Sequence, residues 1–195
     1  MTSSTDPRAG SENEEELFVP SHIGLSPVGE CLGRTVLPGL LLLLSGPMGS
    51  GKTSLAAGLA RGMGIAARIA SPTFLYLQCY PAASSPPSLP LLHADWDRVS
   101  PGAEDLEEAL VEGGSERVTL VEWGEKLPAS VLAIFSLRVR LLLSTPEDRE
   151  GRLLRIVWDA ESGRGEDLSR VRENFRHLLE RELPSLSPPS TNCNP

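Results

Sequence analysis

Residues 46–53 constrain this chain more than any other segment, because their sequence, GPMGSGKT, matches the full pattern of a phosphate-binding loop. The pattern is a glycine, four residues of any kind, and then Gly-Lys-Thr. Glycines let successive backbone N–H groups converge on phosphate oxygens without side chains in the way. In such a loop the lysine brings a positive charge to the outer phosphates, and the threonine hydroxyl is offered to Mg²⁺. The segment therefore predicts a site for a nucleoside triphosphate and Mg²⁺.

The residues on either side of the loop supply the setting that it needs. Residues 40–45, LLLLLS, form a short apolar run between two glycines, which is typical of a buried parallel strand. Residues 52–63 carry leucine and methionine at helical spacing, and Gly64 follows as a helix end. A strand, the loop and a helix in this order distinguish a phosphate-binding loop from a chance match in a glycine-rich turn.

Two further apolar runs end in a carboxylate. Residues 89–95 end at Asp95, and residues 118–122 end at Glu122. The carboxyl ends of parallel strands share one sheet edge, where phosphate-loop proteins place an acid beside the metal or the attacking water. Surface charges at strand ends would give the same pattern. We favour the functional interpretation for Glu122, and the residues alone leave both interpretations open for Asp95.

Residues 71–74, SPTF, form a turn that carries two hydroxyl groups. Pro72 has no backbone N–H, and it biases Ser71 away from helical geometry. A nucleotide-sensing segment and a plain helix-to-strand connection both fit this turn. The spacing alone favours the connection, because such turns are common.

The remaining segments complete an α/β pattern. Residues 17–19 are read as an edge strand, and Ser21 is read as the cap of a weak helix. Residues 137–143 and 154–158 alternate apolar and polar side chains around a turn, which predicts an antiparallel hairpin; residues 168–183 predict an amphipathic helix. We therefore predict the P-loop NTPase class of α/β fold, with a mixed, mostly parallel sheet flanked by helices.

Composition sets the expected domain boundaries and cellular setting. A disordered tail is expected over residues 1–15, one domain over 16–183 and a flexible tail over 184–195. The longest apolar run is too short to cross a membrane, so a cytoplasmic location without membrane attachment is expected. The net charge of −8 gives little reason to expect the chain to grip a nucleic-acid backbone directly.

Four signals follow one another in a specific order: GPMGSGKTS at 46–54, SPTF at 71–74, HAD with Arg98 at 93–98, and LVEW at 120–123. Over roughly residues 19–158 this combination resembles the bacterial ATPase of tRNA threonylcarbamoyladenosine biosynthesis, the TsaE (YjeE) family. The resemblance implies a weak, partner-activated ATPase that uses ATP and Mg²⁺. It also implies a role in modifying adenosine 37 of tRNAs that read codons beginning with A. The implied partner is a two-subunit threonylcarbamoyl transferase, through which the tRNA is met indirectly.

The resemblance assigns roles to the matching positions of this sequence. It implies that ATP is held by the loop residues Gly46, Gly49, Ser50, Gly51, Lys52, Thr53 and Ser54. Thr53 and Glu122 are implied as ligands of Mg²⁺, and Asp95 as the catalytic acid near the metal or the attacking water. Trp123 matches a tryptophan of the family.

The resemblance also assigns roles to residues outside the loop. Ser71 and Thr73 are implied to form a switch-like segment near the γ-phosphate, and Ser21 to lie near the nucleotide. Two positions depart from the family pattern. Pro47 stands where the family usually has an acid, which affects the stiffness of the loop, and Asp97 stands where it usually has tyrosine.

Two other functions share these sequence features. A small-molecule P-loop kinase has the same loop and size, but it should also have an arginine-bearing lid, and no clear lid segment is found in the sequence. A nucleotide-dependent assembly factor would use bound ATP more than its hydrolysis. A GTPase is disfavoured, because no Asn-Lys-x-Asp motif for reading guanine occurs.

Overall fold

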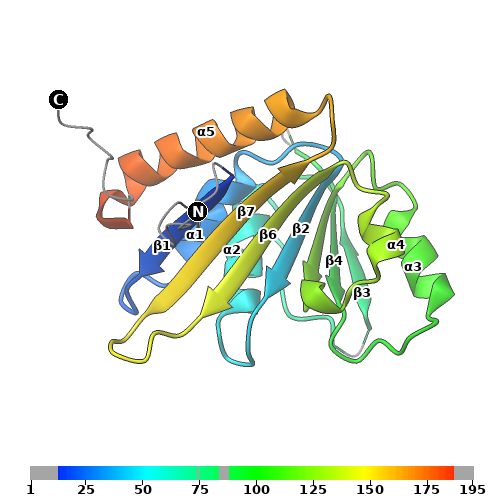
Figure 1. Ribbon diagram of the computed structural model, residues 1–195, viewed down its shortest axis with the longest axis horizontal. Coiled ribbons are helices and arrows are strands. Elements are labelled where there is room, and N and C mark those ends of the chain that lie inside the picture. Colours follow the sequence, from blue (N-terminus) through cyan, green and yellow to red (C-terminus); the bar gives the residue numbers. More distant parts are fainter. Residues whose placement is uncertain (1–12, 74, 84–87, 187–195) are drawn as a thin grey trace, which may run out of the picture.

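The structure, a computed structural model, describes residues 13–73, 75–83 and 88–186. Within these residues the strands form one seven-stranded sheet in the order β1-β7-β6-β2-β5-β4-β3 (Figure 1). The strands are β1 (Glu14–Val19), β2 (Leu40–Ser45), β3 (Leu77–Tyr80), β4 (Leu91–Asp95), β5 (Val118–Glu122), β6 (Leu137–Ser144) and β7 (Arg152–Ala160). The helices are α1 (Ser26–Gly33), α2 (Lys52–Gly62), α3 (Glu104–Val111), α4 (Ala129–Leu132) and α5 (Gly165–Glu182), with short 3₁₀ turns η1 (Gly124–Lys126) and η2 (Pro184–Leu186).

The centre of the sheet is parallel and its two edges are antiparallel. Strands β6, β2, β5 and β4 pair in parallel, and β7, β1 and β3 are added in antiparallel fashion. The mixed α/β fold predicted from the sequence is therefore confirmed, and so is the hairpin, which is formed by β6 and β7. Parallel strands are covered on both faces, which explains why β2 is an unbroken run of leucines.

Helices cover both faces of the sheet, and the leucines of β2 divide between them (Figure 1). Successive side chains of a strand point to opposite faces. The even-numbered Leu40, Leu42 and Leu44 pack in the core that α1, α2 and α5 cover, whereas Leu41 and Leu43 pack in a smaller core with α3 and α4. The strand that precedes the phosphate-binding loop is thereby fixed from both sides.

The amino-terminal boundary differs from the one expected. Strand β1 begins at Glu14, so Glu14 and Glu15 belong to the sheet and not to a tail over 1–15. The reason lies in α5, where Arg172 and Arg176 both pair with the buried Glu15 carboxylate. The sequence pattern missed this long-range ion pair. The rest of the expected tail, residues 1–12, lies outside the described residues.

The first helix and the carboxyl terminus also shift. The helix expected to be capped by Ser21 begins instead at Ser26, because Pro27 is suited only to a first helical turn. Helix α5 extends the amphipathic helix predicted over 168–183 to begin at Gly165. The tail expected over 184–195 starts with η2, whose Leu186 is buried, and residues 187–195 lie outside the described part. No described helix combines the length and apolarity that a membrane span requires.

Helices α1 and α2 pack backbone against backbone. The contact is made by two glycines four residues apart on each helix: Gly29 and Gly33, and Gly58 and Gly62. A Cβ atom at Gly33 would lie 2.1 Å from the carbonyl oxygen of Leu59, and one at Gly58 would lie 2.0 Å from that of Ser26. The glycines of α1, which lower its helix propensity, are thus required for its close approach to the helix that starts at the phosphate-binding loop.

Replacing Gly33 by alanine is expected to destabilise the fold by about 1–3 kcal/mol, because the added methyl group must push two backbones apart. Urea denaturation measures this loss directly. Gly165→Ala is the matched control: it lies at the start of α5 with nothing within 4 Å of the new atom. The control should be neutral or slightly stabilising. Equal effects of the two substitutions would contradict the tight crossing.

Candidate functional site

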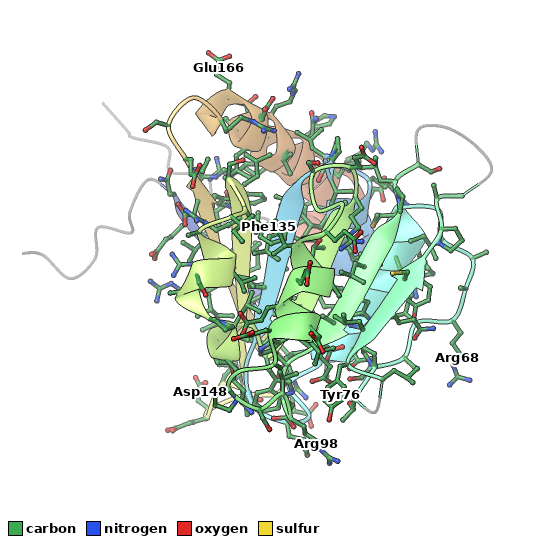
Figure 2. The ribbon with its side chains drawn as sticks, turned by 90° about the vertical axis from the view of Figure 1, so that its right-hand side faces the viewer. Arg68, Tyr76, Arg98, Phe135, Asp148 and Glu166 are labelled. Carbon is green, nitrogen blue, oxygen red and sulfur yellow. The ribbon has the colours of Figure 1, made fainter. Side chains whose placement is uncertain are left out.

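The phosphate-binding loop follows β2 at the sheet edge where β4 and β5 also end. The register pairs Leu44 with Glu122, and Glu122 with Asp95, so the two predicted acids are neighbours beside the loop. They line a cavity of about 360 Å³. Arg98 and Tyr76 project at this same end of the sheet (Figure 2). The structure therefore brings together strand ends that are far apart in the sequence, as the carboxyl edge of a parallel sheet does in this class of fold.

Most of the residues predicted for the site line this cavity: Gly49, Gly51, Lys52, Thr53, Ser54, Ser71, Thr73, Asp95 and Glu122. Three do not. Gly46 packs against β6, where a Cβ atom would lie 2.4 Å from the carbonyl oxygen of Leu143. Ser50 is buried, and its hydroxyl has no hydrogen-bond partner among the described residues. Ser21 lies apart from the cavity and donates to a carboxylate oxygen of Glu150 over 3.3 Å.

The backbone of the loop adopts conformations that need glycine. Gly49 and Gly51 have φ angles of +77° and +103°, in the region that side chains disfavour. Gly51 is the residue that precedes helix α2, so the loop leads directly into the positive end of a helix. Backbone N–H groups and a helix amino terminus at one cavity form a site for an anion.

Lys52 is held at the loop by its own backbone. Its Nζ donates to the carbonyl oxygens of Gly46 and Pro47 over 2.7 and 3.1 Å, and it lies 4.0 Å from the centre of the Trp123 ring. The side chain is only 6% exposed. Trp123 itself has a left-handed backbone, with φ of +59°. The tryptophan thus contributes an aromatic face to the lysine, by a cation–π contact that its position in the sequence did not reveal.

Glu122 is oriented through both of its carboxylate oxygens. Oε2 accepts from the Thr53 hydroxyl over 3.1 Å, and Oε1 lies 3.1 Å from Nε2 of His93. Because a carboxylate can only accept, Nε2 of His93 is the donor. His93 is fully buried, and no site role of its own was predicted for it from the sequence. The available signal was its alternation with Asp95, which puts both side chains on one face of β4.

The Thr53 hydroxyl and the Glu122 carboxylate suit Mg²⁺, which prefers oxygen ligands. Among the described residues there is no group of three or more His, Cys, Asp or Glu that could hold a metal. Mg²⁺ does not need one, because in nucleotide sites it is held by one or two protein groups together with phosphates and water. Bound there, the ion would neutralise charge on the phosphates.

Replacing Glu122 by alanine is expected to weaken ATP binding about tenfold in Mg²⁺ and to leave it nearly unchanged in EDTA, because the oxygens lost serve the cation. Parallel ATP titrations in the two buffers make this comparison. Glu125→Ala is the control, since this nearby glutamate is exposed and does not line the cavity. An equal loss of affinity with and without Mg²⁺ would argue against a role on the metal side.

Asp95 accepts three hydrogen bonds from the surrounding polar groups. Its Oδ2 accepts from the hydroxyls of Ser71 and Thr73 over 2.5 and 2.8 Å, and its Oδ1 accepts from the backbone N–H of Asp97 over 2.9 Å. Burial raises the pKa of Asp95, but the bonds from Ser71, Asp97 and Thr73 together outweigh it and hold the pKa below its ordinary value. Asp95 is therefore a carboxylate at neutral pH, and both hydroxyls of the 71–73 turn are directed at it.

Further cavity residues were not predicted as site residues. Arg98 and Met48 line the cavity and are exposed. Asp97, which stands where the resembled family usually has tyrosine, accepts from Lys126 over 2.6 Å. Lys126 in turn lies 4.7 Å from the centre of the Trp123 ring. The departure at Asp97 therefore coincides with a local ion pair beside the tryptophan.

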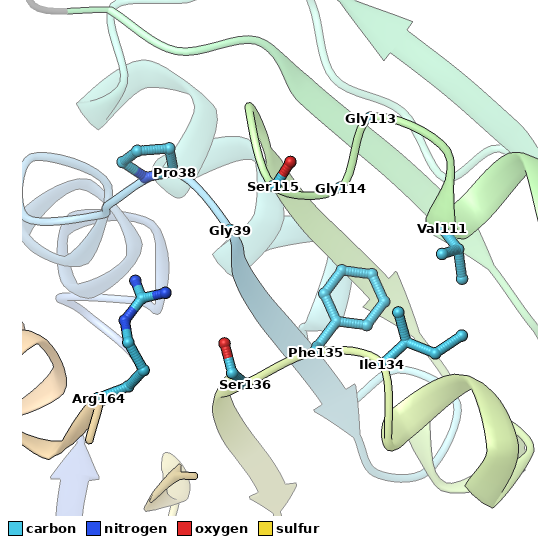
Figure 3. A pocket seen from close by; sticks show the side chains of 10 residues that line it. All are labelled: Pro38, Gly39, Val111, Gly113, Gly114, Ser115, Ile134, Phe135, Ser136 and Arg164. Carbon is cyan, nitrogen blue, oxygen red and sulfur yellow. The ribbon is translucent and has the colours of Figure 1, made fainter. Parts of the chain in front are cut away.

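A second cavity, of about 410 Å³, lies at the amino ends of the central strands, away from the loop (Figure 3). It is formed where β2, β5 and β6 begin, and its wall includes Gly39, Ser115, Phe135 and Arg164. None of the residues predicted for the site lines it. The side chains predicted to bind nucleotide and metal thus lie at the carboxyl ends of the strands, although the cavity there is slightly smaller.

Known proteins resemble this chain in sequence and in fold. The family model of threonylcarbamoyl adenosine biosynthesis protein TsaE matches residues 20–152. The tRNA threonylcarbamoyladenosine biosynthesis protein TsaE of Streptomyces coelicolor is 37% identical over 99 residues, covering 50% of this chain and 66% of that protein. The protein of the same name from Mycobacterium tuberculosis is 36% identical over 141 residues, covering 69% and 82%. The crystal structure of Bacillus subtilis YdiB has the same fold, with a TM-score of 0.60 and 24% identity over 87% of this chain and 99% of that one.

Proposed function

The chain belongs to the family of threonylcarbamoyl adenosine biosynthesis protein TsaE, and we propose that it binds and hydrolyses ATP in support of threonylcarbamoyl modification of tRNA. The modified base is adenosine 37 of tRNAs that read codons beginning with A. The partner in this reaction is the two-subunit threonylcarbamoyl transferase. One observation carries the ATP part of the proposal: the loop, the Thr53–Glu122 pair and the hydrogen-bonded Asp95 all line one cavity.

The loop residues bind the triphosphate. Backbone N–H groups of the loop, such as those of Gly49 and Gly51, and the amino terminus of α2 attract the phosphate oxygens. Lys52 then exchanges its bonds to two neutral loop carbonyls for stronger bonds to the negatively charged β- and γ-phosphates. Thr53 and Glu122 would hold Mg²⁺, which would supply positive charge to the phosphates.

Asp95 accepts a proton from the attacking water, and the 71–73 turn responds to the presence of the γ-phosphate. Water attacks the γ-phosphorus, the bond to the β-phosphate oxygen breaks, and ADP and inorganic phosphate leave; the proton of the water is accepted at Asp95. Ser71 and Thr73 now donate to Asp95, and each hydroxyl has a single proton to donate. A γ-phosphate that accepts these two hydrogen bonds in place of Asp95 would therefore draw the turn toward the nucleotide and leave Asp95 free to accept a hydrogen bond from water. This exchange is a switch of the kind that order or release of a segment produces.

The partner complex is needed for both speed and contact with tRNA. A chain with a net charge of −8 is a poor binder of a polyanion, so the tRNA is met through the transferase, in the cytoplasm. Among the described residues the cavity has one arginine, Arg98, which is exposed at its rim. We expect slow hydrolysis by the protein alone. Hydrolysis should accelerate when the partner supplies a cation or holds Arg98 in one position at the cavity.

Reconstituted modification tests the proposal. Purified transferase, its threonylcarbamoyl donor and unmodified tRNA are incubated with this protein and ATP, and modified adenosine is quantified by mass spectrometry of the nucleosides. Modification should continue over many turnovers only with ATP and this protein. A nonhydrolysable ATP analogue that supports full modification would favour the assembly factor. Modification that does not depend on this protein would contradict the proposal.

A further inference from the structure

Arg152, the first residue of β7, contacts the backbone of the phosphate-binding loop. Its Nε donates to the carbonyl oxygen of Ser50 over 3.0 Å, its Nη2 to that of Gly49 over 3.3 Å, and its Nη1 to that of Gly151 over 2.7 Å. A single guanidinium thus joins two consecutive peptide groups of the loop to the edge of the sheet. The loop and this arginine are about one hundred residues apart in the sequence, and no role predicted from the sequence includes Arg152.

These contacts determine which way the loop peptides face. In a trans peptide the C=O and the following N–H point in opposite directions. The carbonyls of Gly49 and Ser50 therefore share peptide planes with the N–H groups of Ser50 and Gly51. The N–H of Ser50 donates to the carbonyl of Pro47 over 3.2 Å, and Gly51 lines the cavity. The two peptides lie between Gly49 and Gly51, so few steric barriers oppose their rotation. Contacts from outside the loop must therefore fix the direction of their C=O and N–H groups.

The end of the β6–β7 hairpin that carries Arg152 is itself firmly anchored. Arg152 pairs in register with Val19 of β1. A Cβ atom at Gly151 would lie 2.8 Å from the ring of Phe18, and the guanidinium of Arg149 lies 3.8 Å from the centre of that ring. The arginine therefore extends from a packed sheet edge, which is the kind of rigid support that a precisely oriented site requires.

We propose that Arg152 is a positioning residue that keeps the phosphate-binding loop oriented for the β-phosphate of a bound nucleotide. The inference rests on the proposed ATP site and adds a residue to it. The planar guanidinium fits this task because it donates two charge-assisted bonds in a fixed fork, whereas a lysine in its place retains the charge without the fork. Since ATP and ADP both carry a β-phosphate, Arg152 should contribute equally to the binding of either.

The test compares Arg152→Met and Arg152→Lys with the control Arg155→Met. Arg155 lies on the same strand, but it pairs with Glu14 and not with the loop. Calorimetry measures the Kd values of ATP–Mg²⁺ and ADP–Mg²⁺, and amide hydrogen exchange is followed over residues 46–51 without nucleotide. Arg152→Met should raise both Kd values by the same factor, about tenfold, and accelerate exchange in the loop. Arg152→Lys should recover part of the affinity, and Arg155→Met should match the unaltered protein.

Each outcome has one meaning. If the unaltered protein binds neither nucleotide, the proposed ATP site itself fails. If it binds both and Arg152→Met has unchanged affinity and loop exchange, the positioning role is overturned while the ATP site stands. Full recovery by Arg152→Lys would also overturn it, because charge alone would then suffice. Should Arg152→Met not fold, Arg152→Lys alone decides, with a threefold or greater loss expected and no loss contradicting the role.

Discussion

Replacing Lys52 by alanine is expected to raise the Kd for ATP–Mg²⁺ by about 100-fold or more. A hydrogen bond to a charged group contributes roughly 1.5–3 kcal/mol, and the Lys52 ammonium is placed to make such bonds with two phosphates. It already lies within 3.1 Å of two loop carbonyls, so little reorganisation precedes its transfer to phosphate oxygens. Fluorescence or calorimetric titration gives the two constants.

Lys126→Ala is the matched control for this experiment. Lys126 also lies over the ring of Trp123, at 4.7 Å from its centre, but it bonds to Asp97 and not to the loop. Its removal should change the ATP affinity by less than about threefold, as for an exposed ion pair. An ATP affinity that Lys52→Ala leaves unchanged would overturn the assignment of the phosphate-binding loop.

Replacing Asp95 by asparagine is expected to lower the kcat of partner-stimulated hydrolysis by about 10²–10⁴, the usual contribution of a general base. The Kd for ATP should change far less, because the carboxylate serves the transition state more than the bound substrate. Asparagine keeps the shape but loses the charge. Its amide oxygen can still accept hydrogen bonds, but its NH₂ group cannot, whereas both carboxylate oxygens of Asp95 accept them now. Single-turnover kinetics with saturating ATP separates hydrolysis from binding.

Asp97→Asn serves as the control for Asp95. It makes the same chemical change two residues away, on a side chain that pairs with Lys126. We expect kcat to stay within about threefold, since only an exposed ion pair is lost. Equal losses of kcat in both variants would show that general disturbance of this edge, and not the carboxylate of Asp95, accounts for the effect.

The sequence predicted the fold class, and it predicted which residues gather beside the loop, because these depend on local patterns. The loop at 46–53 has a fixed spacing, and its flanking strand and helix have distinct periodicities. The strand-end acids Asp95 and Glu122 followed from one general property of parallel sheets, namely that their carboxyl ends share an edge.

What the sequence could not predict depends on contacts between distant segments. Ser71 and Asp95 are 24 residues apart, and no local pattern predicted the hydrogen bond that joins them. Arg152 and Ser50 are 102 residues apart, and no periodicity relates them. The glycines of α1 lower its helix propensity, so the sequence predicted only a weak helix, and tertiary packing against α2 compensates for that low propensity.

Steady-state release of inorganic phosphate from ATP tests the central claim most directly, that this edge of the sheet is a partner-activated ATPase site. Three mixtures are compared: the protein alone, the protein with tRNA, and the protein with the transferase and tRNA. We expect slow release in the first two and a marked gain in the third, up to the roughly 10³–10⁵ that a cation supplied in trans can provide. The gain should be lost in Asp95→Asn. A full rate without the transferase, or phosphate transferred to a small acceptor in place of water, would contradict the account and favour a kinase.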